Sequence, residues 1–471
     1  MTTAGIDPER LAVVLEVLKE LDHLDPEHPD AVAVRQATAH VYKSVKIRRR
    51  SERQARVTAE DEAVTNLTAT GASDRIDDET RGVLLEASTE TAVVGTLHRA
   101  RSCYICKNRY HAVDAFYHQL CPACAELNRS KRDNRVDLEG RRALLTGGRA
   151  KIGMYIALRL LRDGAHLTIT TRFPHDAVRR FTAMPDSSDW LYRLKVVGID
   201  LRDPHQVVEL AESVAADGPL DVLINNAAQT VRRSRESYAQ LAAAEHAAEA
   251  IETTVPIVDL RSATAEIEGA IGQRMTPEAV TALALTSGSA TLARIEQGIA
   301  IDAGGLVPDL AAENSWSQRV HEIDPVELLE VQLCNAVAPF ILVSRLRPAL
   351  AASSHRRTYV VNVSAMEGQF NRRYKGAGHP HTNMAKAALN MLTRTSAEDM
   401  LSEGILMTAV DTGWITDERP HTTKMRLADE GFHAPLDLVD GAARVYDPIV
   451  RGEAGEDLYG CFLKDYERWA W

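Results

Sequence analysis

The residues RRALLTGGRAKIG, at positions 141–153, decide the fold of this chain. A short apolar run ending at Leu145 leads into a turn with glycines at 147, 148 and 153, and an amphipathic stretch follows. A glycine-rich turn between a strand and a helix lets backbone amides approach phosphate groups at the helix N-terminus. The stretch therefore predicts a strand, a nucleotide-binding turn and a helix.

The rest of the chain after this turn repeats the strand and helix alternation. Short runs rich in β-branched residues are separated by amphipathic helical stretches; they are HLTITTR (166–172), LKVVGID (194–200), VLINNA (222–227), TYVVNVS (358–364) and LMTAVDTG (406–413). Strands that alternate with helices form a parallel sheet through right-handed crossovers. The sequence therefore predicts an α/β fold with a doubly wound parallel sheet of the Rossmann type.

Four segments in this region together resemble the cofactor-binding motifs of the short-chain dehydrogenase/reductase family. Residues 146–153 match the family's TGxxxGxG loop, with Lys151 in place of the middle glycine. Asp200 matches the acid of the adenine pocket, and the run 225–228 (NNAA) resembles the NNAG motif. Arg172 ends the second strand, where an acid would favour NAD, so the resemblance implies NADP, with NAD as the alternative.

The resemblance extends this cofactor site to a later loop. VDTGWITDERP (410–420) resembles the loop that closes over the nicotinamide. The implied site consists of Thr146, Gly147, Gly148, Arg149, Lys151, Ile152, Gly153, Arg172, Asp200, Leu201, Asn226, Ala227, Ala228, Lys386, Gly413 and Thr416.

The catalytic positions of the family are only partly filled. Asn335, Ser364 and Lys386 match three members of its Asn, Ser, Tyr and Lys set, but Thr382 stands where the YxxxK tyrosine is expected. A threonine hydroxyl is a much weaker acid than a phenol, so Thr382 can orient a substrate but is not expected to donate the proton. Tyr374, His379 and His381, in the loop before Lys386, are candidate replacements, and the absence of any acid in this loop is the third alternative.

Two loops at the ends of predicted strands are basic. Gln229, Arg232 and Arg233 follow the NNAA turn, and Arg372 and Arg373 follow Ser364. Arginines at the carboxyl ends of neighbouring strands favour a carboxylated or phosphorylated substrate. Open surface is the alternative position for these charges.

Four of the six cysteines form two CxxC pairs ahead of the α/β region: Cys103 with Cys106, and Cys121 with Cys124. Two such pairs 14 residues apart predict a closed tetrahedral Zn²⁺ site that holds the fold together and leaves no position for a substrate. The pattern resembles a zinc ribbon. A stapled interface to the α/β region is favoured over a protein-binding role.

The whole sequence has 471 residues and a formal net charge of −11, which fits a multidomain globular protein and disfavours nonspecific DNA binding. We expect a helical N-terminal region with a linker (1–100), the zinc module (101–135) and the Rossmann domain (136–471), which contains a helical insertion (235–320). A surface segment or a flexible linker, with a possible domain boundary, is expected near 57–80. No apolar run of about 20 residues and no signal pattern were found, so a cytoplasmic location is expected.

The sequence favours an NADP-dependent oxidoreductase with a non-standard proton donor, acting on an anionic carbonyl or alcohol substrate. The alternatives are an inactive NADP-binding regulator or scaffold, and a redox-neutral epimerase or lyase with bound cofactor. A homo-oligomer is expected, and a nucleic acid or membrane partner is not.

Overall fold

The computed structural model describes residues 5–73, 75, 93–248, 254–261, 276–286, 290–372, 375–416 and 418–471. The chain forms two compact units. The first comprises residues 1–63 with 97–99, and the second comprises 64–96 with 100–471.

The first unit is helical, as expected for the N-terminal region. Helix α1 (Pro8–Glu20) begins at Asp7, whose side chain accepts hydrogen bonds from the amides of Glu9 and Arg10. A 3₁₀ turn (Leu21–His23) follows, and then helix α2 (Pro29–Asn66). The linker prediction near 57–80 was wrong for 57–66, because this alanine- and glutamate-rich stretch has no Gly or Pro before Gly71 and continues the helix.

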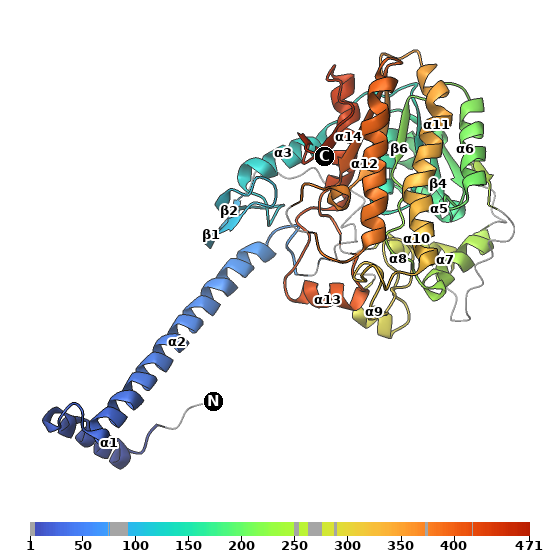
Figure 1. The fold of residues 1–471 in the computed structure, drawn as a ribbon. Helices are drawn as coiled ribbons and strands as arrows, with labels where there is room; N and C mark the ends of the chain where they lie inside the picture. Colours follow the sequence, from blue (N-terminus) through green and yellow to red (C-terminus); the bar gives the residue numbers. More distant parts are fainter. Residues whose placement is uncertain are drawn as a thin grey trace. The chain divides into compact units, whose positions relative to one another are not determined.

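The second unit is built on a mainly parallel sheet of nine described strands, in the order β11-β10-β9-β8-β6-β3-β4-β5-β7 (Figure 1). Strand β11 pairs antiparallel with β10, and the other pairs are parallel. The strands are β3 (Arg142–Leu145), β4 (His166–Thr171), β5 (Leu194–Gly198), β6 (Val222–Asn225), β7 (Ile257–Asp259), β8 (Thr358–Ser364), β9 (Ile405–Asp411), β10 (Phe462–Lys464) and β11 (Glu467–Trp469). The predicted doubly wound α/β sheet is confirmed.

Helices cover the sheet on both faces, and every residue of β8 and β9 is buried. The connecting helices are α4 (Lys151–Arg162), α5 (Pro174–Thr182), α6 (Pro204–Ala216), α10 (Pro325–Gln332), α11 (Ala338–Ala351), α12 (Pro380–Leu401), α13 (His421–Asp429) and α14 (Leu438–Glu453). Short 3₁₀ turns lie at Ser187–Asp189, Leu191–Arg193 and Met366–Gly368. Helices α6, α11 and α12 bury apolar side chains against one side of the sheet.

The continuous helical stretch Pro325–Ala351 is long and apolar enough, by length and composition, to cross a membrane. The expectation that no such stretch exists was therefore wrong, because its few charged side chains do not interrupt the apolar run. Leu342, Leu346 and Leu350 of this stretch are buried in the core beside the sheet. The stretch therefore serves as a core helix of the second unit.

The cysteine module is a β-hairpin followed by a helix: β1 (Val93–Ser102), β2 (Arg109–Asp114) and α3 (Pro122–Asp133). The hairpin begins before the expected boundary at 101. Helix α3 docks on α14 through buried polar contacts: Arg132 with Asp437 and Asp440, Lys131 with Asp447, and Arg444 with Asn128. The module and the sheet therefore share one interior.

The insertion at 235–320 contains helices α7 (Arg235–Ala248), α8 (Pro277–Ala284) and α9 (Leu292–Glu296), as expected, and also the edge strand β7. A small apolar cluster that includes Phe173, Leu241, Val280 and Ile301 joins α7 and α8 to the start of α5. The insertion is thus packed on the sheet edge that carries β4 and β5.

Candidate functional site at the carboxyl ends of the strands

The glycine turn after β3 is held against the NNAA turn after β6. The Thr146 hydroxyl accepts the amides of Asn226 and Ala227, both at 3.0 Å. The Asn226 side chain donates to the carbonyls of Thr146 and Gly147. A Cβ at Gly153 would lie 1.9 Å from the Gly147 carbonyl oxygen, so only glycine fits there. The turn therefore has the close packing that brings its amides to the N-terminus of α4.

Lys151 occupies the position of the missing glycine with a left-handed backbone, φ 52°. Glycine adopts this conformation without cost, whereas a side chain is strained there. The turn thus keeps the backbone shape that the TGxxxGxG pattern implies, although its sequence departs from the pattern.

The adenosine end of the expected cofactor site lies under the insertion. Arg172 donates to the Tyr238 hydroxyl at 3.0 Å, and its guanidinium lies over the Phe173 and Tyr238 rings. Arg149 pairs with Asp176 at 2.5 Å and donates to the Gly304 carbonyl. Burial lowers the pKa of Arg149. Arg149 is therefore committed to a buried ion pair that ties the insertion to the glycine turn.

Asp200 and Leu201 follow β5 at the same edge, and Leu201 is 9% exposed. The Asp200 carboxylate accepts hydrogen bonds from Arg202, which also pairs with Glu330 of α10. Burial opposes ionisation of Asp200, but the hydrogen bonds from Arg202 lower its pKa. The expected adenine-pocket acid is thus an ionised carboxylate held in place.

Ser364 and Lys386 come together at the end of β8. The Ser364 hydroxyl donates to Asn390 Oδ1 at 2.6 Å, and the Lys386 ammonium donates to the Val363 carbonyl at 2.8 Å. Both side chains are buried, and burial lowers the pKa of Lys386 to about 8. The sheet and α12 therefore place a hydroxyl beside a cation that titrates near neutrality.

Asn335 lies in a π-helical turn (Leu333–Val337) between α10 and α11. Its side-chain oxygen accepts the Gln229 amide at 2.7 Å, and its amide group donates to the Gln229 carbonyl at 2.8 Å. Single π turns within helices are frequent at functional sites. The sequence placed Asn335 but gave no signal for this turn.

Thr382 and His381 begin α12 and are almost fully buried, at 2% and 1% exposed. Among the residues that the structure describes, neither the Thr382 hydroxyl nor a ring nitrogen of His381 has a hydrogen-bond partner. The His381 Nε2 lies 4.0 Å from a carboxylate oxygen of Glu327, and burial lowers the pKa of His381. Tyr374 and Arg373 lie outside the described residues. His381 is therefore the candidate acid or base whose surroundings are described.

Asp411 was missed at the sequence level. It ends β9 directly beside Ser364 of β8 and is 4% exposed. Burial raises the pKa of Asp411 to about 6. Its position after an apolar strand and before the TG pair was the available signal.

Gln229, Arg232 and Arg372, which belong to the two loops expected to bind the substrate, each have an acidic neighbour. Gln229 donates to Glu330, Arg232 lies 3.6 Å from the same carboxylate, and Arg372 lies 3.9 Å from Glu367. Arg233 follows Arg232 in the same loop. The side chains at these strand ends therefore form a wall of mixed charge.

The sulfur atoms of Cys103, Cys106, Cys121 and Cys124 all lie within 4.8 Å of one another. The Cys106 and Cys121 sulfurs are 3.6 Å apart. Tetrahedral zinc with Zn–S bonds of about 2.3 Å separates its sulfurs by slightly less than 4 Å, so the donor set fits this metal. The predicted four residues are brought together.

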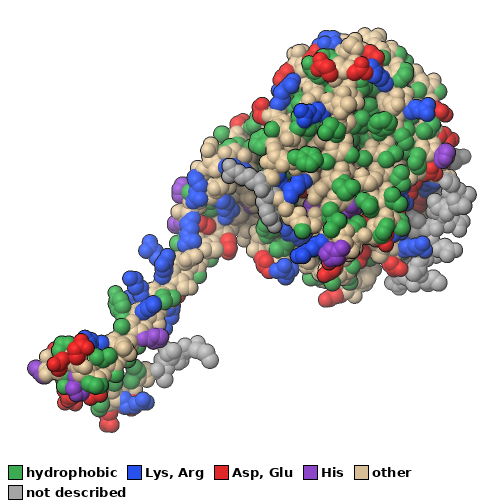
Figure 2. Space-filling model, viewed as in Figure 1, with side chains coloured by type: hydrophobic (Ala, Val, Ile, Leu, Met, Phe, Trp, Pro, Cys, Tyr) green, Lys and Arg blue, Asp and Glu red, His purple; other side chains and the backbone are tan. Residues whose placement is uncertain are grey.

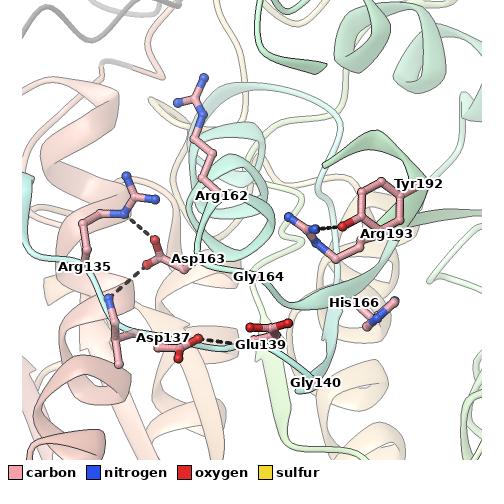
Figure 3. Close-up of a pocket in the computed structure, with 11 residues that line it drawn as sticks. Arg135, Asp137, Glu139, Gly140, Arg162, Asp163, Gly164, His166, Tyr192 and Arg193 are labelled. Atoms are coloured by element: carbon pink, nitrogen blue, oxygen red, sulfur yellow. Dashed lines mark hydrogen bonds and ion pairs between the residues drawn. The ribbon is translucent and has the colours of Figure 1, made fainter. Parts of the chain in front are cut away.

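A cavity of about 650 Å³ lies at the amino ends of β3 and β4, on the side of the sheet opposite to the glycine turn (Figure 3). Its wall contains Arg135, which pairs with Asp163, and Arg193, which donates to Tyr192. Asp163 also accepts the Tyr446 hydroxyl. The charged side chains named here are thus paired within the cavity wall, and the cavity lies away from the glycine turn.

Residues 141–258 match the family model described as short chain dehydrogenase. A protein described as "Uncharacterized protein R665", from Acanthamoeba polyphaga mimivirus, is 31% identical over 367 residues, which cover 74% of this chain and 71% of that protein. The similarity to the short-chain dehydrogenase family therefore covers residues 141–258, and the description of the viral protein names no family.

The chain has further similarities to proteins whose descriptions name an activity or a family. A "Probable oxidoreductase" of Streptomyces antibioticus is 37% identical over 95 residues, 20% of this chain and 30% of that protein. The crystal structure of a short chain dehydrogenase from Burkholderia cenocepacia J2315 in complex with NADP is 21% identical with a TM-score of 0.44, covering 70% of this chain and 97% of that one.

Proposed function

We propose that this chain is an NADP-dependent oxidoreductase that acts on an alcohol or carbonyl compound. The observation that carries the proposal is the placement of the glycine turn after β3, Ser364 at the end of β8 and the buried Lys386 of α12 at the carboxyl ends of the central strands. Bound NADP supplies or accepts the hydride. The chain's own residues then bind the cofactor, orient the substrate oxygen and move its proton.

The residues present fit the cofactor. The cradle at Gly147 and Gly153 has no room for side chains, and the N-terminus of α4 favours phosphate. Arg172 would hold the 2′-phosphate, because Arg149 is committed to Asp176 and Gly304. Lys386 would bind the nicotinamide ribose, and the loop with Gly413 and Thr416 would cover the nicotinamide.

For the proton we propose His381, oriented by Glu327, in place of the missing tyrosine. Thr382 would hold the substrate oxygen through its hydroxyl, which has no hydrogen-bond partner among the described residues. Because burial lowers the pKa of His381, the imidazole is neutral at pH 7 and accepts a proton. The rate of alcohol oxidation, which needs the neutral imidazole as base, should therefore fall as the pH is lowered through the pKa of His381.

For the substrate we propose an anionic group, supported by the positions of Arg232 and Arg372 at the strand ends. Each arginine has an acid within 4 Å, so the substrate anion must compete with Glu330 or Glu367 for its arginine.

The first test is a titration of the purified chain with NADPH and NADH, repeated with Arg172→Ala and with Tyr238→Phe as the matched control. Loss of charge-assisted hydrogen bonds to a phosphate should weaken NADPH binding by about 10-fold or more, and NADH binding should change little. Tyr238→Phe removes the bond to Arg172 without removing its charge and should retain tight NADPH binding. Failure of the wild type to bind either nucleotide would overturn the proposal.

A nucleotide-binding regulator without turnover is the second candidate, because Thr382 offers no useful acid. Tight NADPH binding with no NADP reduction across hydroxy acids, sugar phosphates and alcohols would favour it. If wild type shows NADP reduction that is lost on substituting His381, the regulator hypothesis is contradicted. Cofactor that stays bound through purification would favour a redox-neutral reaction.

We propose that the four cysteines bind one structural Zn²⁺. Metal analysis should give about one zinc per chain, and the double variant Cys103→Ser, Cys106→Ser should lose it. The matched control, Cys334→Ser with Cys461→Ser, should keep it. Zinc-free wild-type protein that folds normally would overturn this part of the proposal.

We also propose a homo-oligomer that forms through α10, α11 and α12. Leu329, Phe340, Met384 and Met391 are each more than half exposed on this face, and Figure 2 shows apolar side chains gathered over it. Phe340→Glu should shift the mass measured by light scattering toward that of one chain. A cytoplasmic location stays a proposal, supported by the grouping of four cysteines in a metal-type cluster, a use of cysteine that fits a reducing compartment.

A further inference from the structure

The segment from Gly413 to Asp437 leaves the sheet after β9, carries α13 and returns to the start of α14. Its two ends meet where the Trp414 and Phe432 rings lie 5.2 Å apart. A Cβ at Gly413, whose φ is 76°, would lie 2.6 Å from Leu436. The two ends of this segment are therefore packed together, and their positions determine where the loop before α13 lies.

The cysteine module contacts the outgoing end of the segment through Tyr104. The Tyr104 hydroxyl accepts the Trp414 amide at 2.9 Å. Tyr104 lies between Cys103 and Cys106, and its own amide donates to the Gln119 carbonyl at 2.8 Å. Lys464 of β10 lies over its ring, 5.8 Å from the centroid. Tyr104 is thus held by the module through its backbone and contacted by β10 at its ring, and its hydroxyl holds one backbone amide of the loop.

The module and the residues just before it also contact the returning end. The Gln119 side chain donates to the His433 carbonyl at 3.2 Å. The buried Arg75 guanidinium donates to the carbonyls of Ala434 and Leu436, at 2.8 and 2.7 Å. These contacts bind backbone atoms, so they fix the path of the chain and do not depend on the side chains of the segment.

We propose that Tyr104 is a positioning residue of the cofactor site: the cysteine module holds both ends of the Gly413–Asp437 segment and thereby sets the loop that covers the nicotinamide. This inference rests on the proposed function, because that function supplies the nicotinamide. The module therefore acts on cofactor binding from outside the cleft, in addition to closing the fold.

The physical consequence is local. Without the Tyr104 oxygen, the Trp414 amide loses its acceptor, and the loop samples open arrangements more often. The affinity for a ligand that needs the closed loop then falls in proportion to the closed fraction. A ligand that stops at the adenosine end does not need this loop and keeps its affinity.

The test compares Tyr104→Phe with wild type and with Tyr110→Phe. Tyr110 belongs to the same module, but its hydroxyl donates to the His118 carbonyl inside the module. Hydrogen exchange read by mass spectrometry should show exchange at Trp414 rising by about ten-fold or more in Tyr104→Phe and unchanged in Tyr110→Phe. NADPH should bind about three- to ten-fold more weakly to Tyr104→Phe, whereas 2′,5′-ADP should bind equally to all three proteins.

Each other outcome overturns the inference in a recognisable way. Unchanged exchange at Trp414 shows that Tyr104 does not hold the loop. Faster exchange with unchanged NADPH affinity shows that the loop does not serve the cofactor. Equal weakening of NADPH and 2′,5′-ADP shows a general structural effect. If wild type binds neither nucleotide, the proposed function fails by itself, and the cofactor role of Tyr104 fails with it, whereas the exchange data still decide the contact.

Discussion

The buried ion pairs between α3 and α14 lead to a prediction about stability. Arg132 is 9% exposed and lies 2.6 Å from Asp437 Oδ1 and 3.1 Å from Asp440 Oδ1. Tyr117 donates to the same Asp440 carboxylate at 2.6 Å. Arg132→Met keeps most of the side chain's length and removes its charge, so it leaves two carboxylates without their main cation.

The expected loss follows from this burial. Removing one partner of a buried ion pair typically costs about 3–5 kcal/mol, because the remaining charge is left in a poorly solvated position. Arg426→Met is the control: in the pair of Arg426 with Glu430 both side chains are more than half exposed, at 63% and 54%. Solvent screening limits such a pair to about 1 kcal/mol or less.

The assay is urea unfolding of the two variants and wild type, followed by tryptophan fluorescence at pH 7.5 and pH 5. Burial raises the pKa of Asp440, and loss of Arg132 should raise it further, so protonation at pH 5 should remove part of the deficit of Arg132→Met. The reasoning is refuted if the free energy of unfolding of Arg132→Met lies within about 1 kcal/mol of that of Arg426→Met at pH 7.5.

Three further predictions concern the cofactor edge. Lys151→Gly should have a free energy of unfolding about 0.5–1 kcal/mol higher than that of Lys151→Ala, because both variants lose the charge but only glycine relieves the left-handed backbone. Equal midpoints in urea unfolding would contradict this. Asp411→Asn should be more stable than wild type by up to about 3 kcal/mol at pH 7.5 and no more stable at pH 4. The pKa of Asp411 is about 6 in the folded chain and 3.8 ordinarily, so above pH 6 the ionised carboxylate destabilises the folded wild type, and at pH 4 the folded wild type already carries the protonated acid. Thermal melts at both pH values test this. Gly153→Ala should abolish NADPH binding in a fluorescence titration, since its Cβ would lie 1.9 Å from the Gly147 oxygen, whereas Gly376→Ala, with open space around it, should bind normally.

The parallel sheet could be predicted because each central strand is a short β-branched run bounded by a turn, and the helices between them are amphipathic. Strand β7 could not be predicted, because its three residues pair with β5 only after the insertion has folded back on the sheet edge. The start of β1 and the length of α2 were also missed, since composition alone did not separate a polar helix from a linker.

The candidate site was predictable where a backbone requirement leaves a mark in the sequence. Gly147 and Gly153 are such positions, and the cysteines of the module are another. Ion pairing leaves no such mark: Arg149 has the sequence of a phosphate ligand, yet in the fold it faces Asp176, which is 27 residues away. Asp411 was missed because its neighbour Ser364 lies on another strand, and the sequence does not show which strand residues lie side by side.

The contacts between α3 and α14 also bear on how the chain is made. Lys131 and Asp447 are 316 residues apart, so a ribosome that adds about 5–20 residues per second completes the cysteine module roughly 15–60 seconds before its docking helix emerges. During that interval Arg132 and its neighbours have no carboxylates to meet. Thiolate capture of a metal would let the nascent module keep its shape while it waits, and release of a chain that stops before α14 would leave a basic, unburied surface for quality control to recognise.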